Sequence, residues 1–317
     1  MQFLSALLSS MPGAAAQGLI WGVMAIGVYI TYKILDVADL TVDGSLCTGG
    51  AVCVILTLNG CPMPVALIAA VIAGMLAGFV TGIFHTAFGI PAILAGILTQ
   101  LALYSVNLHI MGWGTDNGSK ANLPISVDKY NLLVSSRYVW DIKVDNPIFI
   151  LAIFLIIIIF VLYWFFGTEL GSSLRATGAN GNMARAQGIN TNFTKVLGLM
   201  ISNGLVALSG ALLSQYQGFS DINMGRGAIV IGLAAVIIGE VIFDKIFRNF
   251  GLKLLSCVIG AIIYYVVIQI VLKMGLSTDD LKLLTALVVA LFLAVPYLKS
   301  KHFSGKAKSV KGGAGNA

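Results

Sequence analysis

The longest stretch of the chain without a charged side chain lies between Asp43 and Asp116, where no Asp, Glu, Lys or Arg occurs. The hydrocarbon core of a bilayer requires roughly 20 apolar residues per helix, so this stretch can hold about three crossings. Charged residues make up only 10% of the whole chain, against about 25% in soluble domains. Apolar runs such as 148–166 do not alternate with polar residues, as strands of a membrane barrel would. The sequence therefore predicts an all-α, polytopic membrane protein.

Uncharged windows predict about nine transmembrane helices. Their expected limits are 13–33, 44–59, 63–84, 90–110, 147–167, 193–217, 227–241, 252–273 and 282–298. Residues 1–12 lack the basic start of a signal peptide, so we expect them to form an interfacial lead-in to a transmembrane domain that spans 13–298. The tail, 299–317, is basic and rich in Gly and Ser, which predicts a disordered segment at the cytoplasmic surface.

Basic residues are unequally divided between the two sides that these crossings would create, and basic loops stay in the cytoplasm. The richer side holds twelve: Lys33, Arg175, Arg185, Lys195, Lys245, Arg248, Lys253, Lys299, Lys301, Lys306, Lys308 and Lys311. The poorer side holds seven: Lys120, Lys129, Arg137, Lys143, Arg226, Lys273 and Lys282. This division predicts a cytoplasmic C-terminus, an N-terminus outside, and an extracytoplasmic loop at 111–146.

Two segments of the chain look alike, which indicates an internal repeat. Residues 39–45 and residues 221–227 each contain Asp and Gly and each lead into an apolar helix. About five crossings separate the two helices, and an odd offset would make the repeat inverted, as in many transporters whose solutes pass near the repeat interface. A chance match between two short turn sequences is the alternative.

Residues 169–190 are too polar for a crossing and are divided by glycines. We expect Ser172 or Ser173 to cap a short helix that Gly178 ends, and Asn182 to cap a second one that Gly188 ends. Both helices would lie on the cytoplasmic face with their arginines exposed. By composition alone, a solvated connector would be the simpler interpretation.

This segment resembles the cytoplasmic motif of permeases in the branched-chain amino acid and ribose ABC importer superfamily. The matching pattern is Gly171-x-x-Leu174-Arg175-Ala176-Thr177-Gly178-x-Asn180, followed by Ala184-x-x-x-Gly188-Ile189-Asn190. Residues 39–50 resemble the family's turn before an early pore-lining helix, except that Asp43 stands where the family has Gly, which moves Gly44 and Ser45 one place later. Residues 198–240 look closest to a Gram-positive subgroup that takes up aromatic amino acids such as tryptophan or tyrosine.

The resemblance implies that this segment forms coupling helices that dock into ATPase subunits at the cytoplasmic face. The residues that it would place there are Leu174, Arg175, Ala176, Gly178, Asn180, Met183, Ala184, Arg185 and Gly188. We expect Leu174 or Met183 to anchor the contact, and the arginines to pair with acidic residues of the ATPase. The family also implies an extracytoplasmic substrate-binding protein, which the 111–146 loop and the 218–226 turn would face, and a second permease copy in a homodimer.

Polar residues inside the bilayer are the candidates for a translocation pathway. They are Asp39, Gly44, Ser45, Asn203, Gln217, Asp221 and Gly225, with Asp43, Gln100, Asn107, Gln215 and Gln269 as further polar residues in or beside crossings. Asn203 and Gln217 are close to four helical turns apart and would share a face. Hydrogen bonding between helices is the alternative role for the amides, and capping of helix starts is the alternative for the carboxylates. A mostly apolar pathway suits an apolar or aromatic amino acid.

Gly74, Gly78 and Gly82 repeat at intervals that place them on one helical face, which predicts close helix packing. The partner of that face could be a neighbouring helix of this chain or a second copy.

No motif indicates an enzyme: the chain has no G-x-x-x-x-G-K-[ST] phosphate loop, no G-x-S-x-G and no H-E-x-x-H. We expect no metal site, because His85 and His109 would lie on opposite membrane sides and the four cysteines fit small buried hydrophobes. We also expect no cofactor and no nucleic-acid partner. The predicted function is a permease subunit that imports an aromatic or other apolar amino acid. A ribose or nucleoside permease and an ATPase-independent secondary transporter are the alternatives.

Overall fold

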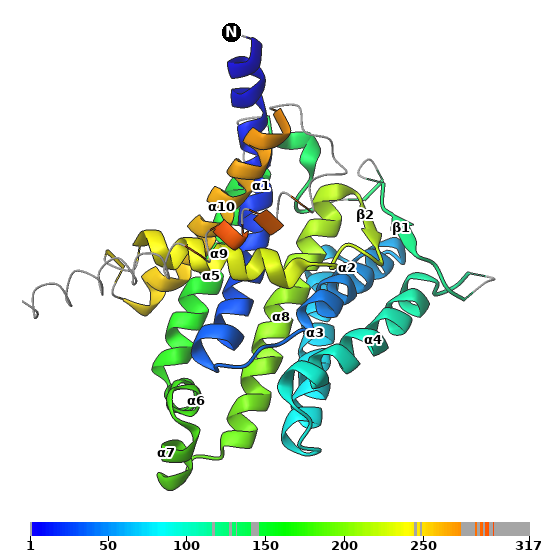
Figure 1. The fold of residues 1–317 in the computed structure, drawn as a ribbon. Coiled ribbons are helices and arrows are strands. Elements are labelled where there is room, and N and C mark those ends of the chain that lie inside the picture. Colours follow the sequence, from blue (N-terminus) through cyan, green and yellow to red (C-terminus); the bar gives the residue numbers. More distant parts are fainter. Residues whose placement is uncertain are drawn as a thin grey trace, which may run out of the picture.

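The computed structural model describes residues 2–115, 118–126, 129, 130, 132–140, 146–243, 246, 247, 249–273, 283, 286, 287, 289–291 and 294, with side chains from residue 9 onward. Helices dominate this part of the chain (Figure 1). The N-terminal half contains α1 (Gln2–Tyr29), the π-helix η1 (Ile30–Ile34), α2 (Val42–Leu58), α3 (Met63–Thr86), α4 (Ala92–Met111), β1 (Asn122–Pro124) and the 3-10 helix η2 (Ser136–Tyr138). The C-terminal half contains α5 (Pro147–Gly167), α6 (Glu169–Ala179), α7 (Gly181–Ala186), α8 (Thr191–Gln217), β2 (Phe219–Asp221), α9 (Ala228–Phe243) and α10 (Phe250–Lys273).

Six helical stretches in the described residues are long and apolar enough to cross a bilayer: Ser9–Ile34, Met63–Thr86, Ala92–Met111, Pro147–Gly167, Thr191–Gln217 and Phe250–Lys273. Helices α2 and α9 are apolar but have only 17 and 16 residues, and at 1.5 Å per residue they are shorter than a hydrocarbon core of about 30 Å. Figure 1 shows α9 running crosswise to the long helices. The crossings expected at 44–59 and 227–241 are therefore short helices.

Two other expectations meet the limits of the described residues. More than half of the crossing expected at 282–298 lies outside them, so the total of nine and the inverted repeat stay predictions. Residues 2–12 of the stretch expected as a lead-in belong to α1, which begins at Gln2. The interfacial position of this stretch is also still a prediction.

Helix α8 forms the centre of the bundle, and α3 packs against it through the glycine face predicted from the sequence. A Cβ atom on Gly74 would overlap the carbonyl oxygen of Asn203, and one on Gly78 would overlap that of Leu199. Missing side chains let two helix backbones approach closely, which strengthens van der Waals packing in a membrane. The glycine face therefore meets a helix of the same chain.

Helix α2 crosses α8 equally closely. A Cβ atom on Gly49 would overlap the carbonyl oxygen of Ala207, and a Cβ atom on Gly210 would overlap that of Leu46. The two glycines come from opposite helices, so each backbone enters the space that a side chain on the other would fill. This contact fixes where the short helix α2 lies on the long helix α8.

Apolar side chains also cover the outside of the bundle, as a surrounding bilayer requires. On α5, Phe160 is 71% and Trp164 is 69% exposed, whereas α1 and α8 are mostly buried. Large contiguous apolar surfaces are rare on soluble monomers. Helix α5 therefore presents a surface suited to lipid, and α8 the protein interior.

The two ends of the bundle are built differently. Helices α6 and α7 lie at one end, and the antiparallel pair β1–β2 lies near the opposite end (Figure 1). Residues Asn122, Leu123 and Pro124 pair with Asp221, Ser220 and Phe219, respectively. This pairing joins the loop expected at 111–146 to the turn expected at 218–226, two segments that lie far apart in the sequence.

The substitution Gly78→Ala is expected to lower the stability of the bundle, because the new methyl group must push α3 away from α8. Overpacking of this kind costs about 1–3 kcal/mol. Thermal unfolding of the purified protein in detergent should show a lower midpoint for this variant.

Gly167→Ala is the matched control, since a Cβ there meets no atom within 4 Å and alanine is the better helix former. Its midpoint should be unchanged or higher. A Gly78→Ala variant as stable as Gly167→Ala would contradict the packing argument.

Candidate functional site

A buried polar network lies where the chain passes from η1 to α2. The Asn203 amide donates a hydrogen bond of 2.7 Å to the Asp39 carboxylate, and Ser45 Oγ donates one of 2.6 Å to Asn203 Oδ1. The other Asp39 oxygen accepts the backbone N–H of Thr41 at 2.9 Å. All these side chains are buried, and buried polar groups are stable only when they are hydrogen-bonded. The network therefore ties the start of α2 to the middle of α8.

Asp43 links α2 to α9. Its two carboxylate oxygens accept backbone N–H groups of Gly227 and Ile229, each at 3.0 Å. These groups belong to the start of α9, where N–H groups lack helical partners and the helix dipole is positive. Gly225 permits this approach, because a Cβ on it would overlap the carbonyl oxygen of Asp43. The N-terminal ends of α2 and α9 therefore meet at Asp43.

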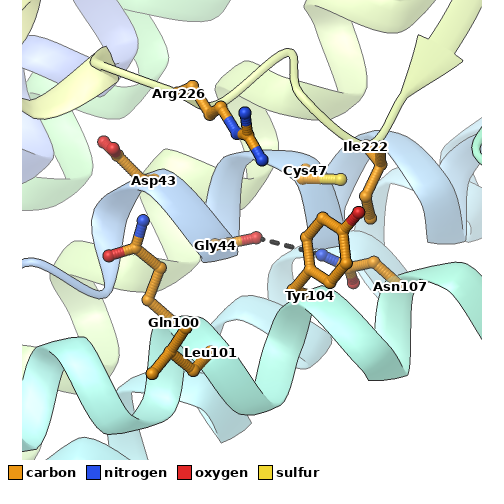
Figure 2. Close-up of a pocket in the computed structure, with 9 residues that line it drawn as sticks. All are labelled: Asp43, Gly44, Cys47, Gln100, Leu101, Tyr104, Asn107, Ile222 and Arg226. Carbon is orange, nitrogen blue, oxygen red and sulfur yellow. Dashed lines mark hydrogen bonds between the residues drawn. The ribbon is translucent and has the colours of Figure 1, made fainter.

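A cavity of about 280 Å³ opens beside this meeting point. Figure 2 shows its walls, which come from α2, from α4 and from the segment between β2 and α9. The lining residues are Asp43, Gly44, Cys47, Gln100, Leu101, Tyr104, Asn107, Ile222 and Arg226. The walls thus combine one cation, one carboxylate and two amides with aromatic and aliphatic side chains, a composition typical of small-molecule sites.

The residues predicted for the pathway have different places. Gly44 lines the cavity, while Asp39, Ser45 and Asn203 form the buried network behind it. Gln217 is exposed at the end of α8, so it does not share an environment with Asn203. These positions give the amide and hydroxyl of the network a role in holding helices together.

Asp221 does not start a helix, which corrects the sequence-based prediction. It lies in β2, where its carboxylate accepts the backbone N–H of Asn223 at 2.7 Å and an Asn122 side-chain N–H at 3.2 Å. The carboxylate that caps α9 is that of Asp43, from a distant part of the sequence.

Three polar residues of the cavity lie on α4: the sequence had indicated Gln100 and Asn107 as polar residues within a crossing, and it missed Tyr104. Gln100, Tyr104 and Asn107 are spaced by four and then three residues, so they share one face of that helix. This spacing of polar groups in an apolar helix was the available signal. Arg226, Cys47 and Ile222 carried no such signal, because only the tertiary structure places them against α4.

The glycine-divided segment does form two short helices, α6 and α7, with different caps from those expected. Thr168 Oγ1 accepts the Gly171 N–H at 3.4 Å, and Asn180 Oδ1 accepts the Met183 N–H at 3.0 Å. Ser172, Ser173 and Asn182 are therefore not the caps. Gly178 lies inside α6 and does not end it. A Cβ on Gly178 would overlap the carbonyl oxygen of Ile34 in η1. Its function is close packing, and the helix ends one residue later.

Several residues expected to meet an ATPase also fasten the segment to its own chain. Leu174 is fully buried, so it is not an exposed anchor, which corrects that expectation. The Arg175 guanidinium donates a hydrogen bond of 2.7 Å to the Phe166 carbonyl and lies 5.7 Å from the centre of the Phe250 ring. Arg185 Nε donates to Thr191 Oγ1 at 2.8 Å. Met183, by contrast, is 55% exposed on α7.

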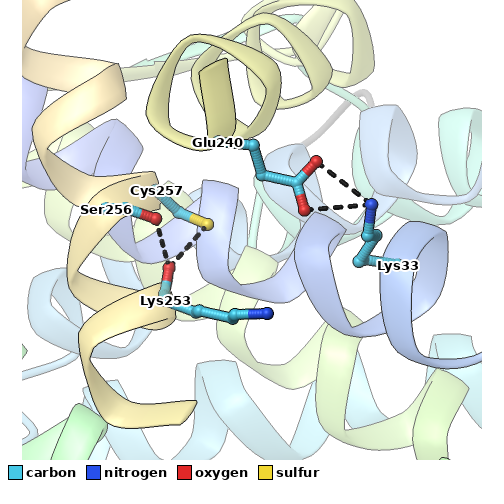
Figure 3. A network of polar contacts seen from close by, with 5 residues as sticks. All are labelled: Lys33, Glu240, Lys253, Ser256 and Cys257. Atoms are coloured by element: carbon cyan, nitrogen blue, oxygen red, sulfur yellow. Dashed lines mark hydrogen bonds and ion pairs between the residues drawn. The ribbon is translucent and has the colours of Figure 1, made fainter. Parts of the chain in front are cut away.

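An ion pair joins η1 to α9 near the same end of the molecule. Lys33 Nζ lies 3.0 Å from a Glu240 carboxylate oxygen (Figure 3). A second cavity of about 380 Å³ is lined here by Tyr29, Lys33, Ile34, Arg175, Gly178, Ala179, Phe250 and Lys253. Helix α6 therefore contacts η1 directly and faces α10 across this cavity.

The described residues contain no cluster of three or more His, Cys, Asp or Glu side chains able to hold a metal ion. His85 Nε2 lies 3.4 Å from Lys195 Nζ, beside the start of α8, and His109 lies near the end of α4. Cys47, Cys53 and Cys257 are buried as free thiols.

Comparison with known proteins gives matches over almost the whole chain. The family model described as "Branched-chain amino acid transport system / permease component" matches residues 10–296. The chain is 40% identical over 303 residues to the "Tyrosine transport system permease protein" of Clostridioides difficile, covering 96% of this chain and 97% of that protein. The "Ribose import permease protein RbsC" of Escherichia coli K12 is a more distant relative, with 25% identity over 68% of this chain and 64% of its own length. Among solved structures, PsaBC from Streptococcus pneumoniae aligns with 95% of this chain and 96% of that chain at 16% identity, and its TM-score of 0.49 is too low to support a conclusion.

The substitution Asn203→Ala is expected to destabilise the protein, because it leaves one oxygen of the buried Asp39 carboxylate without its donor. Loss of one partner of a buried polar pair costs about 1–3 kcal/mol. The thermal unfolding midpoint in detergent should fall measurably. Gln217→Ala on the same helix is the control and should leave the midpoint unchanged, since Gln217 is exposed. Equal midpoints for the two variants would show that the network does not stabilise the fold.

Proposed function

Because this chain belongs to the permease family of branched-chain amino acid transport systems, we propose that it carries an aromatic amino acid into the cell. Its coarser role follows from the family: it is the permease component of an ABC-type transport system, a multi-pass membrane protein that is not itself an enzyme. The observation that carries the proposal of an aromatic solute is the 40% identity, over nearly the full length of both chains, to a tyrosine transport permease.

The cavity between α2 and α4 supports the same class of solute. Its volume of about 280 Å³ lies just below the usual range of small-molecule sites, roughly 300–1,000 Å³, so it suits one small solute. Tyr104 and Leu101 offer an aromatic and an aliphatic surface, and Gln100 and Asn107 offer amides. These groups match a solute with an apolar ring at one end and polar groups at the other.

We assign α6 and α7 as the segment that docks on the ATPase. The segment projects at one end of the bundle (Figure 1) and exposes Met183 at its tip helix, where an apolar side chain can enter a groove of a partner. Buried Leu174 and the hydrogen bond from Arg175 hold α6 to the bundle. A segment held in this way would move as one body with the helices around it when the ATPase closes.

The docking end sets the orientation. With α6 and α7 in the cytoplasm, the end that bears β1–β2 and the start of α1 lies outside (Figure 1). The joined 111–146 and 218–226 segments then face the substrate-binding protein, and the basic C-terminal tail lies inside. A second copy of the chain completes the pore as a homodimer.

Transport in proteoliposomes tests the proposal. Vesicles that contain the permease and its partner ATPase, supplied with the binding protein, should accumulate labelled tyrosine only when ATP reaches the ATPase. Unlabelled tryptophan and phenylalanine should compete, and ribose should not. Uptake driven by an ion gradient without the ATPase would indicate a secondary transporter, and uptake of ribose alone would indicate a sugar permease.

The substitution Met183→Glu is expected to abolish stable association with the ATPase, because it places a charge where an apolar contact forms. Co-purification of the ATPase with the tagged permease measures this, together with tyrosine uptake. Met183→Leu keeps the apolar volume and should behave like the unmodified protein. Retention of the ATPase by the glutamate variant would refute the assignment of α7.

A further inference from the structure

Three features of the cavity lined by Asp43 and Asn107 distinguish it from a packing gap. It contains a buried acceptor with no partner among the described residues, a cation with no carboxylate partner among them, and the meeting ends of two short helices. Each of these features bears on the chemistry of an occupant.

The first feature is the side chain of Asn107. The residue is only 1% exposed, yet its Oδ1 atom accepts no hydrogen bond within the described part of the chain. Its amide nitrogen donates to the Gly44 carbonyl at 3.4 Å (Figure 2). The amide oxygen therefore points away from that carbonyl. An unpaired buried acceptor is destabilising, so a donor from an occupant would be stabilising.

The second feature is Arg226. It lies on the segment between β2 and α9, and its guanidinium extends over the cavity in Figure 2. In the part of the chain that the structure describes, Lys33 and Glu240 form the ion pair and Arg226 forms none. Asp43, the carboxylate drawn in that view, has both oxygens occupied by the start of α9. The guanidinium is therefore available for an anionic group.

The third feature is that two helices begin at the same wall. Helices α2 and α9 both begin here, and helix starts favour negative charge. Broken helices whose starts point at an anionic solute group are a recurrent arrangement in transporters. Because Asp43 already occupies the N–H groups at the start of α9, a solute carboxylate would find its bidentate donor at this side of the cavity in Arg226.

We infer that this cavity binds the solute as a zwitterion, with the carboxylate on Arg226 and the ammonium group on Asn107 Oδ1. The side chain of the solute lies along Tyr104 and Leu101. This inference rests on the proposed function for the class of solute and adds the site and the recognition of both charged groups. A neutral pentose has no group that would use Arg226 in this way.

Two tyrosine analogues separate the two contacts. L-tyrosinamide lacks the carboxylate, and 3-(4-hydroxyphenyl)propionate lacks the ammonium group. The full-length permease in lipid nanodiscs is titrated with tyrosine and with each analogue, and binding is measured by calorimetry. The unmodified protein should bind tyrosine at least about tenfold more tightly than either analogue, because each charged contact is worth a charge-assisted hydrogen bond.

Two variants should then remove one preference each. Arg226→Gln should bind tyrosine and tyrosinamide equally while it still discriminates against the propionate. Asn107→Leu should bind tyrosine and the propionate equally while it still discriminates against tyrosinamide. Lys120→Gln, a basic residue outside the cavity lining, should keep both preferences. Size-exclusion profiles check that each variant is folded.

If these residues had a purely structural role, each substitution would weaken the binding of all three ligands by the same factor, and that result would overturn the inference. So would unchanged preferences in both variants, or no tyrosine binding by the unmodified permease. If ATP-driven tyrosine uptake persists in those cases, the proposed function stands and only the site is wrong. If no aromatic amino acid is taken up at all, the proposed function itself fails.

Discussion

Close contact with α8 is the constraint on which the rest of the structure depends. In a bilayer, helices gain little from burying apolar surface against one another, so association relies on van der Waals contact and on hydrogen bonds. Gly74 and Gly78 let α3 approach α8, and Gly49 and Gly210 let α2 and α8 cross. Asn203, on the same helix, then supplies the hydrogen bonds that hold the start of α2 in place. The close backbone contacts and the buried hydrogen bonds thus both involve α8.

This anchoring explains how the chain can leave helical conformation within the bundle. Between η1 and α2, the backbone would expose polar groups at a cost of several kcal/mol each if it faced lipid. Here the Val37 N–H donates to Thr31, and the Thr41 N–H donates to Asp39. Because α2 begins only after this break, its start lies beside the start of α9. The cavity with Asn107 and Arg226 is the result.

The contacts around η1 connect α6 to the wall of the cavity beside Asp43. Gly178 of α6 lies against the Ile34 carbonyl of η1, and Lys33 of η1 pairs with Glu240 of α9. At its other end, α9 is held by Asp43 of α2. Helix α9 is therefore tied at both ends to the same η1–α2 stretch that α6 touches. A rigid displacement of α6 would reach the cavity wall through packed groups and an ion pair, with no need for a long disordered link.

The amino-acid sequence by itself determined that this protein lies in a lipid bilayer and that it is built from helices. Charge-free windows long enough to cross a bilayer are compatible with few other folds, and the motif around Arg175 and Gly178 indicated the family. It could also predict that the glycine face of α3 packs closely, because small residues at helical spacing have few other uses. Only the tertiary structure decided which helix that face meets, that Leu174 turns inward, and that Asp43 caps a helix far along the chain. The physical reason is that periodicity reports which face of a helix is special, whereas the partner of a hydrogen bond or a cavity wall depends on how distant segments are brought together.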